Sequence, residues 1–161
     1  MNDIIAVTIG DIKGIGIELL IKLWKNKKNN NFVLFTNLKI FKNYLKNKKL
    51  NIKINIIKNQ LNFLSKIDYK NKINLYNYEC KNNEDNTYKS LYNSYQLTKK
   101  KYFIGILTLP LNKKKIIKEI NNNFIGQTEY FQKIDKKNTS NMIFKKNKLI
   151  ITTLTTHIKL K

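Results

Sequence analysis

Apolar residues occur along this chain in short runs, and polar, glycine-containing or lysine-rich stretches separate them. The first run, from Ile4 to Ile9, is rich in β-branched residues and stops at Gly10, which is typical of a buried strand that leads into a loop. Gly14 and Gly16 give this loop backbone freedom. Large apolar residues then recur near helical spacing and predict a helix that contains Ile17, Leu19, Leu20, Leu23 and Trp24.

The alternation of strand and helix patterns continues to the end of the chain. Further strands are predicted at residues 32–36, 52–56, 73–76, 103–107, 141–144 and 149–153. Further helices are predicted over residues 40–45, 87–99, 113–120 and 126–131, and the second of these has Tyr88, Leu91, Tyr92 and Tyr95 on its apolar face. Because strands alternate with helices, the predicted fold is α/β, with a mainly parallel sheet and helices on both faces.

The length and composition are those of a folded domain. A chain of 161 residues buries roughly 70% of its extended-chain surface, and 42% of these residues are hydrophobic. We find no internal repeat and no linker rich in Gly, Pro or Ser. We therefore expect residues 1–161 to form a single α/β unit.

The formal net charge of +22 raises the hypothesis of a basic nucleic-acid-binding protein. The chain has 32 lysines but no arginine. Lys, Asn and Ile, each of which has at least one codon built wholly from A and T, together account for 83 residues. Nucleic-acid surfaces generally use arginine as well, because its planar fork pairs with phosphate and guanine. The lysines are also scattered along the chain. The charge therefore indicates an AT-rich genome, and nucleic acid is the least favoured partner.

The cysteine content and the start of the chain favour a cytoplasmic protein. Cys80 is the only cysteine, so the sequence predicts neither a disulfide framework nor a pair of cysteine metal ligands. Residues 1–9 contain Asp3, have no basic leader, and hold an apolar run too short for a signal peptide or a membrane span. We expect no membrane partner.

Two segments near predicted strand ends carry candidate chemistry. The segment from Thr8 to Glu18 is a glycine-bearing loop before a helix, where backbone amides can receive an anion. Its spacing matches neither the dinucleotide fingerprint nor the P-loop, so a tight structural turn is the alternative. The segment from Leu107 to Lys113 lies at the carboxyl end of a predicted strand, where open α/β sheets hold their ligands.

Two later segments add further candidates. The first is Gly126 to Phe131, and the second is Thr155 to Leu160. The second contains His157, the only histidine of the chain. Taken by itself, a lone histidine is more often a structural residue than a metal ligand.

In order along the chain, these four segments resemble motifs of the 4-hydroxythreonine-4-phosphate dehydrogenase family of vitamin B6 synthesis, whose fold is related to the isocitrate and isopropylmalate dehydrogenases. The family's Thr-Gly-Pro-(apolar)-His-Lys corresponds to Thr108–Lys113, its Gly-His-Thr-Glu-Phe-Phe to Gly126–Phe131, and its Thr-Thr-His-(apolar)-Pro-Leu to Thr155–Leu160. The family's Gly-Asp-Pro-Ala-Gly-Ile-Gly-Pro-Glu is matched at Gly10, Asp11, Gly14, Ile15, Gly16 and Glu18.

The resemblance implies that residues 1–161 correspond to the amino-terminal half of the family enzyme, with an incomplete isocitrate/isopropylmalate dehydrogenase-like fold. The implied activity is an oxidoreductase reaction in pyridoxal phosphate synthesis: NAD-dependent oxidation, with decarboxylation, of 4-phosphohydroxy-threonine. The resemblance places contacts to this phosphorylated amino acid on Gln127 and Thr128, and a ligand of a divalent cation (Zn, Mg or Co) on His157. It also implies a homodimer. The cation would polarise substrate oxygens as a Lewis acid.

Several positions depart from the family pattern. Gln127 and Asn112 stand where the family has histidines, Leu109 where it has glycine, and Lys159 where it has proline. Glutamine cannot become the cation that histidine offers a phosphate. In the family, the other metal histidines and much of the cofactor site belong to the second half, so no catalytic or cofactor-binding residue is assigned before Lys161. Two hypotheses follow: an enzyme half completed by a separate second-half chain, or an eroded remnant without chemistry.

Overall fold

A computed structural model describes residues 3–26, 31–57, 67–68 and 71–153, which form two compact units divided after Phe124. The first unit contains five strands, β1 (Ile5–Thr8), β2 (Phe32–Phe35), β3 (Ile54–Ile57), β4 (Ile73–Tyr76) and β5 (Gly105–Thr108). Its helices are α1 (Ile15–Lys25), α2 (Leu38–Asn47), α3 (Asn83–Lys99) and α4 (Lys113–Glu119). The second unit contains α5 (Gln127–Ile134), β6 (Ile143–Lys146) and β7 (Leu149–Thr152).

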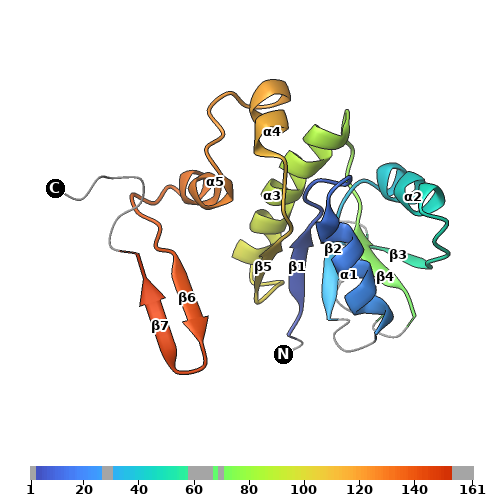
Figure 1. Cartoon of the computed structure of the whole chain (residues 1–161), viewed down its shortest axis with the longest axis horizontal. Coiled ribbons are helices and arrows are strands. Elements are labelled where there is room, and N and C mark those ends of the chain that lie inside the picture. Colours follow the sequence, from blue (N-terminus) through green and yellow to red (C-terminus); the bar gives the residue numbers. More distant parts are fainter. Residues whose placement is uncertain (1–2, 27–30, 58–66, 69–70, 154–161) are drawn as a thin grey trace. The chain divides into compact units, whose positions relative to one another are not determined.

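The five strands of the first unit form one sheet in the order β3-β4-β2-β1-β5, and every neighbouring pair is parallel (Figure 1). The loops that follow the strands therefore leave from the same edge of the sheet. In the second unit, β6 and β7 pair in antiparallel fashion. None of the helices in the described ranges is long and apolar enough to cross a membrane.

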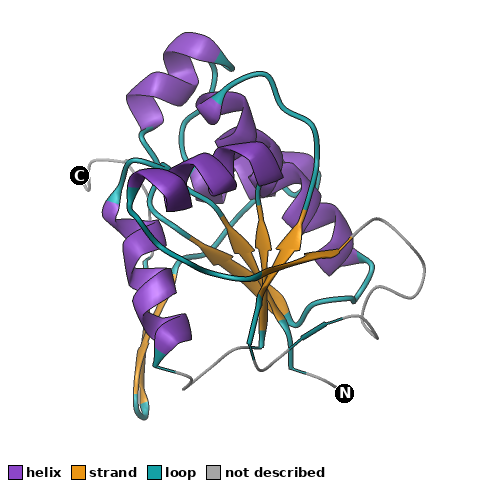
Figure 2. Ribbon diagram, turned by 90° about the vertical axis from the view of Figure 1, so that its right-hand side faces the viewer, coloured by secondary structure: helices purple, strands orange, loops and turns teal. Residues whose placement is uncertain are grey.

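Helices cover both faces of the sheet, and Figure 2 shows the strands fanning out between them. On one face, buried residues of α1 and α2 such as Ile17, Leu20 and Phe41 pack with Val7 and Leu34 of the sheet. On the other face, α3 packs against β1, β2 and β5, and a second cluster forms around Ala6, Val33, Phe35 and Leu97. The predicted α/β class with a parallel sheet covered on both sides is confirmed.

The buried face of α3 differs from the predicted one. The sequence analysis placed Tyr88, Leu91, Tyr92 and Tyr95 toward the core, but Tyr92 is 47% exposed. The buried side of the helix is instead made largely of small polar residues, namely Asn86, Thr87, Ser90 and Ser94, together with Leu91 and Leu97. Both serine hydroxyls donate to carbonyls of their own helix, which allows them to be buried.

Several element boundaries also differ from the prediction. α3 begins at Asn83 because the side chain of Asn82 accepts a hydrogen bond from the Asp85 amide (2.8 Å) and caps the helix. β5 starts at Gly105, so the buried Phe103 lies in the preceding loop. β6 starts two residues later than predicted, and all residues of β6 and β7 are exposed.

Lysine occupies a left-handed position after three helices. Lys49, Lys101 and Lys136 have φ angles of 52°, 63° and 55°. After α2, the amides of Lys49 and Leu50 donate to the carbonyls of Lys46 and Leu45, which is the Schellman arrangement that usually contains glycine. The chain has only 5 glycines, so the compositional bias toward lysine has a structural cost at these three positions.

We expect Lys49→Gly and Lys101→Gly each to raise the free energy of unfolding by about 0.5–1 kcal/mol, because glycine removes the left-handed strain. The measurement is chemical denaturation of each variant. Lys42→Gly, at an exposed position inside α2, is the matched control and should lower stability by about 1 kcal/mol. Equal effects at Lys42 and Lys49 would contradict this explanation.

Candidate functional site

The glycine loop after β1 packs directly against the loop after β5. Gly10 has a φ of +62°, and the Asp11 amide donates a hydrogen bond to the Pro110 carbonyl (2.8 Å). A Cβ on Gly10 would overlap the Pro110 carbonyl oxygen and would lie 2.9 Å from Leu109 Cβ. The first two predicted segments, 99 positions apart at Gly10 and Leu109, therefore meet at the carboxyl edge of the sheet.

A second glycine of the first segment makes a similar close approach. A Cβ on Gly16, in the first turn of α1, would lie 2.9 Å from Pro110 Cδ and 3.1 Å from Leu109 Cβ. Both Gly10 and Gly16 are thus explained by contact with the Leu109-Pro110 backbone and side chains. Two of the matched glycines are needed for this contact, independently of any ligand.

Two amides of this loop donate hydrogen bonds to Asp11. The Lys13 amide donates to the Asp11 carboxylate (2.9 Å), and the Gly14 amide donates to the Asp11 carbonyl (2.9 Å). These bonds form the tight turn that was one of the two interpretations of the sequence, while the start of α1 has no side-chain cap at Gly14.

Two buried threonines hold these loops in place. The Thr87 hydroxyl, on α3, donates to the Gly10 carbonyl (2.6 Å), and the Leu109 amide donates to the Thr8 hydroxyl oxygen (3.3 Å). Both threonine side chains are buried. The sequence did not indicate this role of Thr87, because its partner Gly10 lies 77 residues away and the two residues belong to no repeated pattern.

Two of the positions that depart from the family pattern have structural roles here. Leu109 is buried and belongs to the core cluster on the α1 face. Asn112 caps α4, because its side chain accepts a hydrogen bond from the Lys115 amide (3.2 Å). Each residue therefore contributes to the fold at the place where the family pattern has a glycine or a histidine.

The matched Glu18 makes an exposed ion pair with Lys48 at the end of α2 (2.5 Å). The hydrogen bond and charge of Lys48 lower the pKa of the Glu18 carboxyl, so the carboxylate stays ionised near neutral pH. This contact joins α1 to α2. It gives Glu18 a structural role in this chain.

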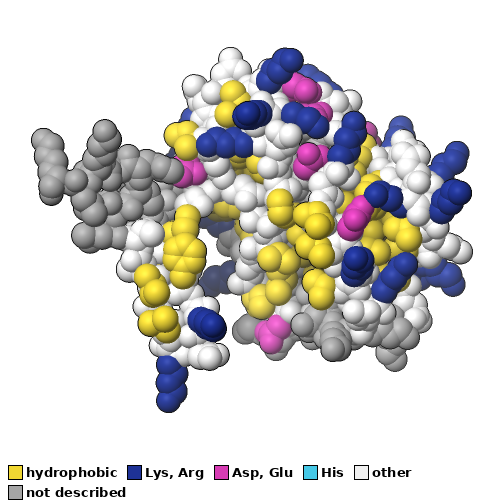
Figure 3. Space-filling model, viewed as in Figure 1, with side chains coloured by type: hydrophobic (Ala, Val, Ile, Leu, Met, Phe, Trp, Pro, Cys, Tyr) yellow, Lys and Arg dark blue, Asp and Glu magenta, His cyan; other side chains and the backbone are white. Residues whose placement is uncertain are grey.

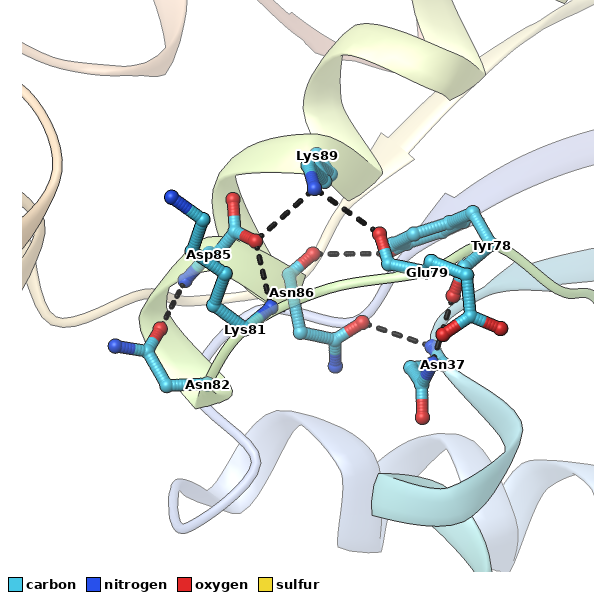
Figure 4. A network of polar contacts seen from close by, with 8 residues as sticks. All are labelled: Asn37, Tyr78, Glu79, Lys81, Asn82, Asp85, Asn86 and Lys89. Carbon is cyan, nitrogen blue, oxygen red and sulfur yellow. Dashed lines mark hydrogen bonds and ion pairs between the residues drawn. The ribbon is translucent and has the colours of Figure 1, made fainter.

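A buried polar network, which the sequence analysis missed, occupies the ends of β2 and β4 (Figure 4). The Asn86 side-chain oxygen accepts a hydrogen bond from the Asn37 amide (2.8 Å), and the Asn86 side-chain nitrogen donates to Thr36 (3.0 Å). The Asn37 side chain in turn donates to the Tyr78 carbonyl (2.7 Å). Each polar group of the network has a partner inside the fold, so it fixes the starts of α2 and α3 relative to the sheet.

Tyr78 and Cys80 lie after β4 and are both shifted toward their neutral forms. Burial raises the pKa of the Tyr78 phenol well above its ordinary value, and the phenol donates to the Asn86 carbonyl (2.8 Å). Burial also raises the pKa of the Cys80 thiol. A raised pKa lowers the fraction of the nucleophilic thiolate near neutral pH, which disfavours covalent catalysis by Cys80.

The buried phenol of Tyr78 predicts an alkaline loss of stability. Its folded-state pKa is raised, so the stabilisation is complete below the unfolded pKa of about 10 and declines as the pH rises above that value. We expect Tyr78→Phe to make this decline less steep. The measurement is the free energy of unfolding in urea at several pH values between about 8 and about 11. Tyr92→Phe, at a side chain that is 47% exposed, is the control and should leave the slope unchanged.

The two predicted substrate contacts lie in the second unit. Gln127 and Thr128 are the first two residues of α5, after the extended Gly126, so the predicted glycine loop does open a helix. Gln127 is half-buried and Thr128 is exposed. Backbone amides of the first turn of a helix favour an anion, which is compatible with a phosphate next to these side chains.

His157, the predicted metal ligand, lies outside the described residues. Within the described ranges, no group of three or more His, Cys, Asp or Glu side chains is placed to hold a metal ion. The structure therefore brings the first two segments together, places the third at the start of a helix in the other unit, and leaves the fourth untested.

Comparisons with known proteins identify a family over most of the chain. The sequence profile of a family described as "Pyridoxal phosphate biosynthetic protein PdxA" matches residues 27–161. No curated protein sequence matches the chain at a significant level.

Solved structures of longer proteins share the fold. A protein assigned as a 4-hydroxythreonine-4-phosphate dehydrogenase from Salmonella typhimurium matches with a TM-score of 0.80 at 21% identity, over 98% of this chain and 53% of that one. The 4-hydroxythreonine-4-phosphate dehydrogenase from Klebsiella pneumoniae matches with a TM-score of 0.79 at 20% identity, over 98% of this chain and 52% of that one. The chain thus spans about half the length of these solved relatives.

Proposed function

Because the chain belongs to the PdxA family of pyridoxal phosphate biosynthetic proteins, we propose that it supplies the amino-terminal half of an NAD-dependent dehydrogenase. The proposed reaction is the oxidation of 4-phosphohydroxy-threonine, followed by decarboxylation. In this proposal residues 1–161 correspond to the first half of the family enzyme, and the second half of the family fold contributes the remaining site residues.

The observation that carries the proposal is the contact between the Gly10–Gly16 loop and Leu109-Pro110. Two family-like segments from distant parts of the sequence pack together at the carboxyl edge of a parallel sheet, where ligands bind in open α/β folds. The contact needs glycine at Gly10 and Gly16, and both positions match the family pattern.

The proposed substrate contacts are Gln127 and Thr128. The amide of Gln127 can donate a hydrogen bond to a phosphate oxygen, and the Thr128 hydroxyl can do the same. Both residues open α5, so the positive end of the helix dipole would favour the phosphate. Gln127 carries no charge, so we expect weaker phosphate binding than a histidine would give.

The residues that the structure describes do not complete a metal site. Its only histidine is His157, and the described residues contain no cluster of metal-binding side chains. A catalytic cation generally has about three protein ligands. We therefore propose that His157 provides one ligand of a divalent cation (Zn, Mg or Co), and that the second half provides the others and most of the NAD site. When bound, such a cation acts as a Lewis acid toward substrate oxygens.

The test is an assay of NADH formation with 4-phosphohydroxy-threonine, NAD and a divalent cation. The chain is assayed alone and after co-expression with the carboxyl-terminal half of the Salmonella typhimurium relative. We expect turnover only in the second case. The absence of turnover in both cases would refute the proposed activity.

A second candidate is an eroded, inactive remnant of the same enzyme. It is favoured by one specific observation: Leu109 and Asn112, which differ from the family pattern, now serve the core and a helix cap. The remnant hypothesis predicts a stably folded chain that binds neither substrate nor metal. Ligand binding, measured apart from turnover, distinguishes the two candidates.

A further inference from the structure

The strand β3 forms one edge of the five-stranded sheet. It pairs with β4, and none of the described strands lies on its other side. The Lys53 carbonyl accepts a hydrogen bond from the Ile73 amide of β4 (3.0 Å). Because the N–H and C=O groups of successive strand residues point to alternate sides, the backbone groups of Ile54 and Ile56 point away from β4. These groups form an edge that can pair with a further strand.

A groove of about 440 Å³ lies between α2 and this edge. Lys42 and Lys46 of α2 stand in its wall. Its apolar lining consists of Leu38, Leu45, Leu50, Ile52, Ile54 and Ile56. Figure 3 shows hydrophobic side chains on the α2 side of the first unit with lysines around them. We call this surface the α2 groove.

The α2 groove and the edge of β3 share two residues. The side chains of Ile54 and Ile56 line the groove, and the backbone groups of the same residues point outward from the sheet. In paired strands, side chains at opposite positions lie on the same face of the sheet. A strand added beside β3 would therefore gain backbone hydrogen bonds and apolar contacts in the groove at the same time.

The α2 groove is positively charged. Lys42 and Lys46 are both exposed, and no Asp or Glu is among the described residues that line the groove. In the sequence, no acidic residue occurs between Glu18 and Asp68. Two other depressions differ, because the one next to α1 contains no lysine and the one before α3 has two glutamates besides its two lysines. Charge complementarity therefore favours an acidic ligand for the α2 groove.

The lining of the α2 groove favours a peptide over other polyanions. Surfaces that bind single-stranded nucleic acid stack bases on aromatic side chains, and none of the described lining residues is aromatic. Surfaces that bind membranes project large apolar side chains, but the most exposed apolar residue of this lining is Ile56, at 41%. A recessed apolar groove beside a strand edge fits the side chains of an extended peptide.

We propose that the α2 groove binds an extended segment of a partner protein, in which acidic residues flank apolar ones, as a strand added beside β3. The backbone of the segment pairs with Ile54 and Ile56, and its carboxylates lie near Lys42 and Lys46. A second copy of this chain is a poor occupant, because its net charge of +22 would bring like charges together. This binding requires neither the substrate nor the cation of the proposed function, so either can fail without the other.

The experiment measures binding of a fluorescent peptide, Glu-Glu-Val-Thr-Val-Thr-Val-Glu-Glu, to the full chain by fluorescence anisotropy. A peptide with lysines in place of the glutamates tests the charge, and one with N-methylated central amides tests the backbone pairing. The protein variant is Lys42→Glu/Lys46→Glu. The matched control is Lys114→Glu/Lys118→Glu, which makes the same change of charge at exposed lysines of α4 with the same spacing.

We expect a dissociation constant on the order of 10 μM for the wild type and for Lys114→Glu/Lys118→Glu, and about tenfold weaker binding by Lys42→Glu/Lys46→Glu. The wild type should bind the lysine and N-methylated peptides at least about tenfold more weakly than the acidic one. Thermal unfolding of each variant checks that its fold is intact.

Three results would overturn the proposal. The first is no binding of the acidic peptide by the wild type. The second is equal binding by the two double variants, or of the three peptides. The third is tighter binding of phosphatidylserine vesicles or of oligothymidylate that depends on Lys42 and Lys46, which would make the α2 groove a membrane or nucleic-acid surface instead.

Discussion

Gly10→Ala is expected to lower the free energy of unfolding by about 3 kcal/mol or more. Two effects act together in this variant. Alanine is strained at a φ of +62°, and its Cβ would overlap the Pro110 carbonyl oxygen, which is backbone and cannot rotate away. The Asp11 amide also donates to that same oxygen, so moving the loop would lengthen a hydrogen bond between the two segments. Urea denaturation followed by circular dichroism measures the loss.

Gly105→Ala is the matched control for Gly10→Ala. Gly105 lies in β5, and a Cβ built on it meets nothing within 4 Å. We expect its substitution to change stability by no more than about 0.5 kcal/mol. Equal stability of the two alanine variants would mean that the contact between the β1 and β5 loops leaves room for a Cβ at Gly10.

Asn86→Leu is expected to cost about 3 kcal/mol, although leucine has a similar size and is more apolar. The substitution leaves the Asn37 amide and the Thr36 hydroxyl without their partner in a buried place. A buried donor without an acceptor has lost its hydrogen bonds to water and forms none within the protein. The same denaturation measurement applies.

Asn93→Leu, at a partly exposed position of the same helix, controls for helix propensity and for added apolar surface. We expect an effect within about 0.5 kcal/mol. A loss of stability at Asn93 as large as that at Asn86 would mean that the polar network is not what stabilises α3.

Much of the fold is predictable from the chain because its elements have clear periodicities. The β-branched run at residues 4–9 and the alternating run at 52–56 correspond to β1 and β3, and the glycine loops precede α1 and α5 as expected. The parallel arrangement follows from the alternation of strands with helices. Periodicity carries this information because a buried strand and an amphipathic helix each have a fixed repeat of side-chain directions.

The buried face of α3 could not be predicted in the same way. Apolar periodicity predicted that Tyr92 lies on the buried face of α3. That face instead contains Asn86 and Thr87, whose partners Thr36 and Gly10 lie 50 and 77 residues away. A polar residue becomes a core residue only when distant partners satisfy it, and a local pattern does not contain those partners.

The candidate site was predicted in part. The sequence placed the glycine loop and the Leu107–Lys113 segment at strand ends, which agrees with the ends of β1 and β5. The contact between the two loops was not predicted. The structural uses of Asn112 and Glu18 were not foreseen, because a helix cap and a bridge between helices depend on where the neighbouring helix begins or ends. Gln127 and Thr128 stay proposed substrate contacts, and His157 stays a proposed metal ligand.

The proposed function requires this chain to bind the phosphorylated substrate and a divalent cation through Thr128 and His157. The most direct test is calorimetric titration with 4-phosphohydroxy-threonine, with and without a divalent cation, of the chain co-purified with the second half and of its His157→Ala variant. We expect micromolar, cation-dependent binding that His157→Ala abolishes, with 1 μM corresponding to about −8 kcal/mol. No binding by the wild type, or the same binding by His157→Ala, would contradict it.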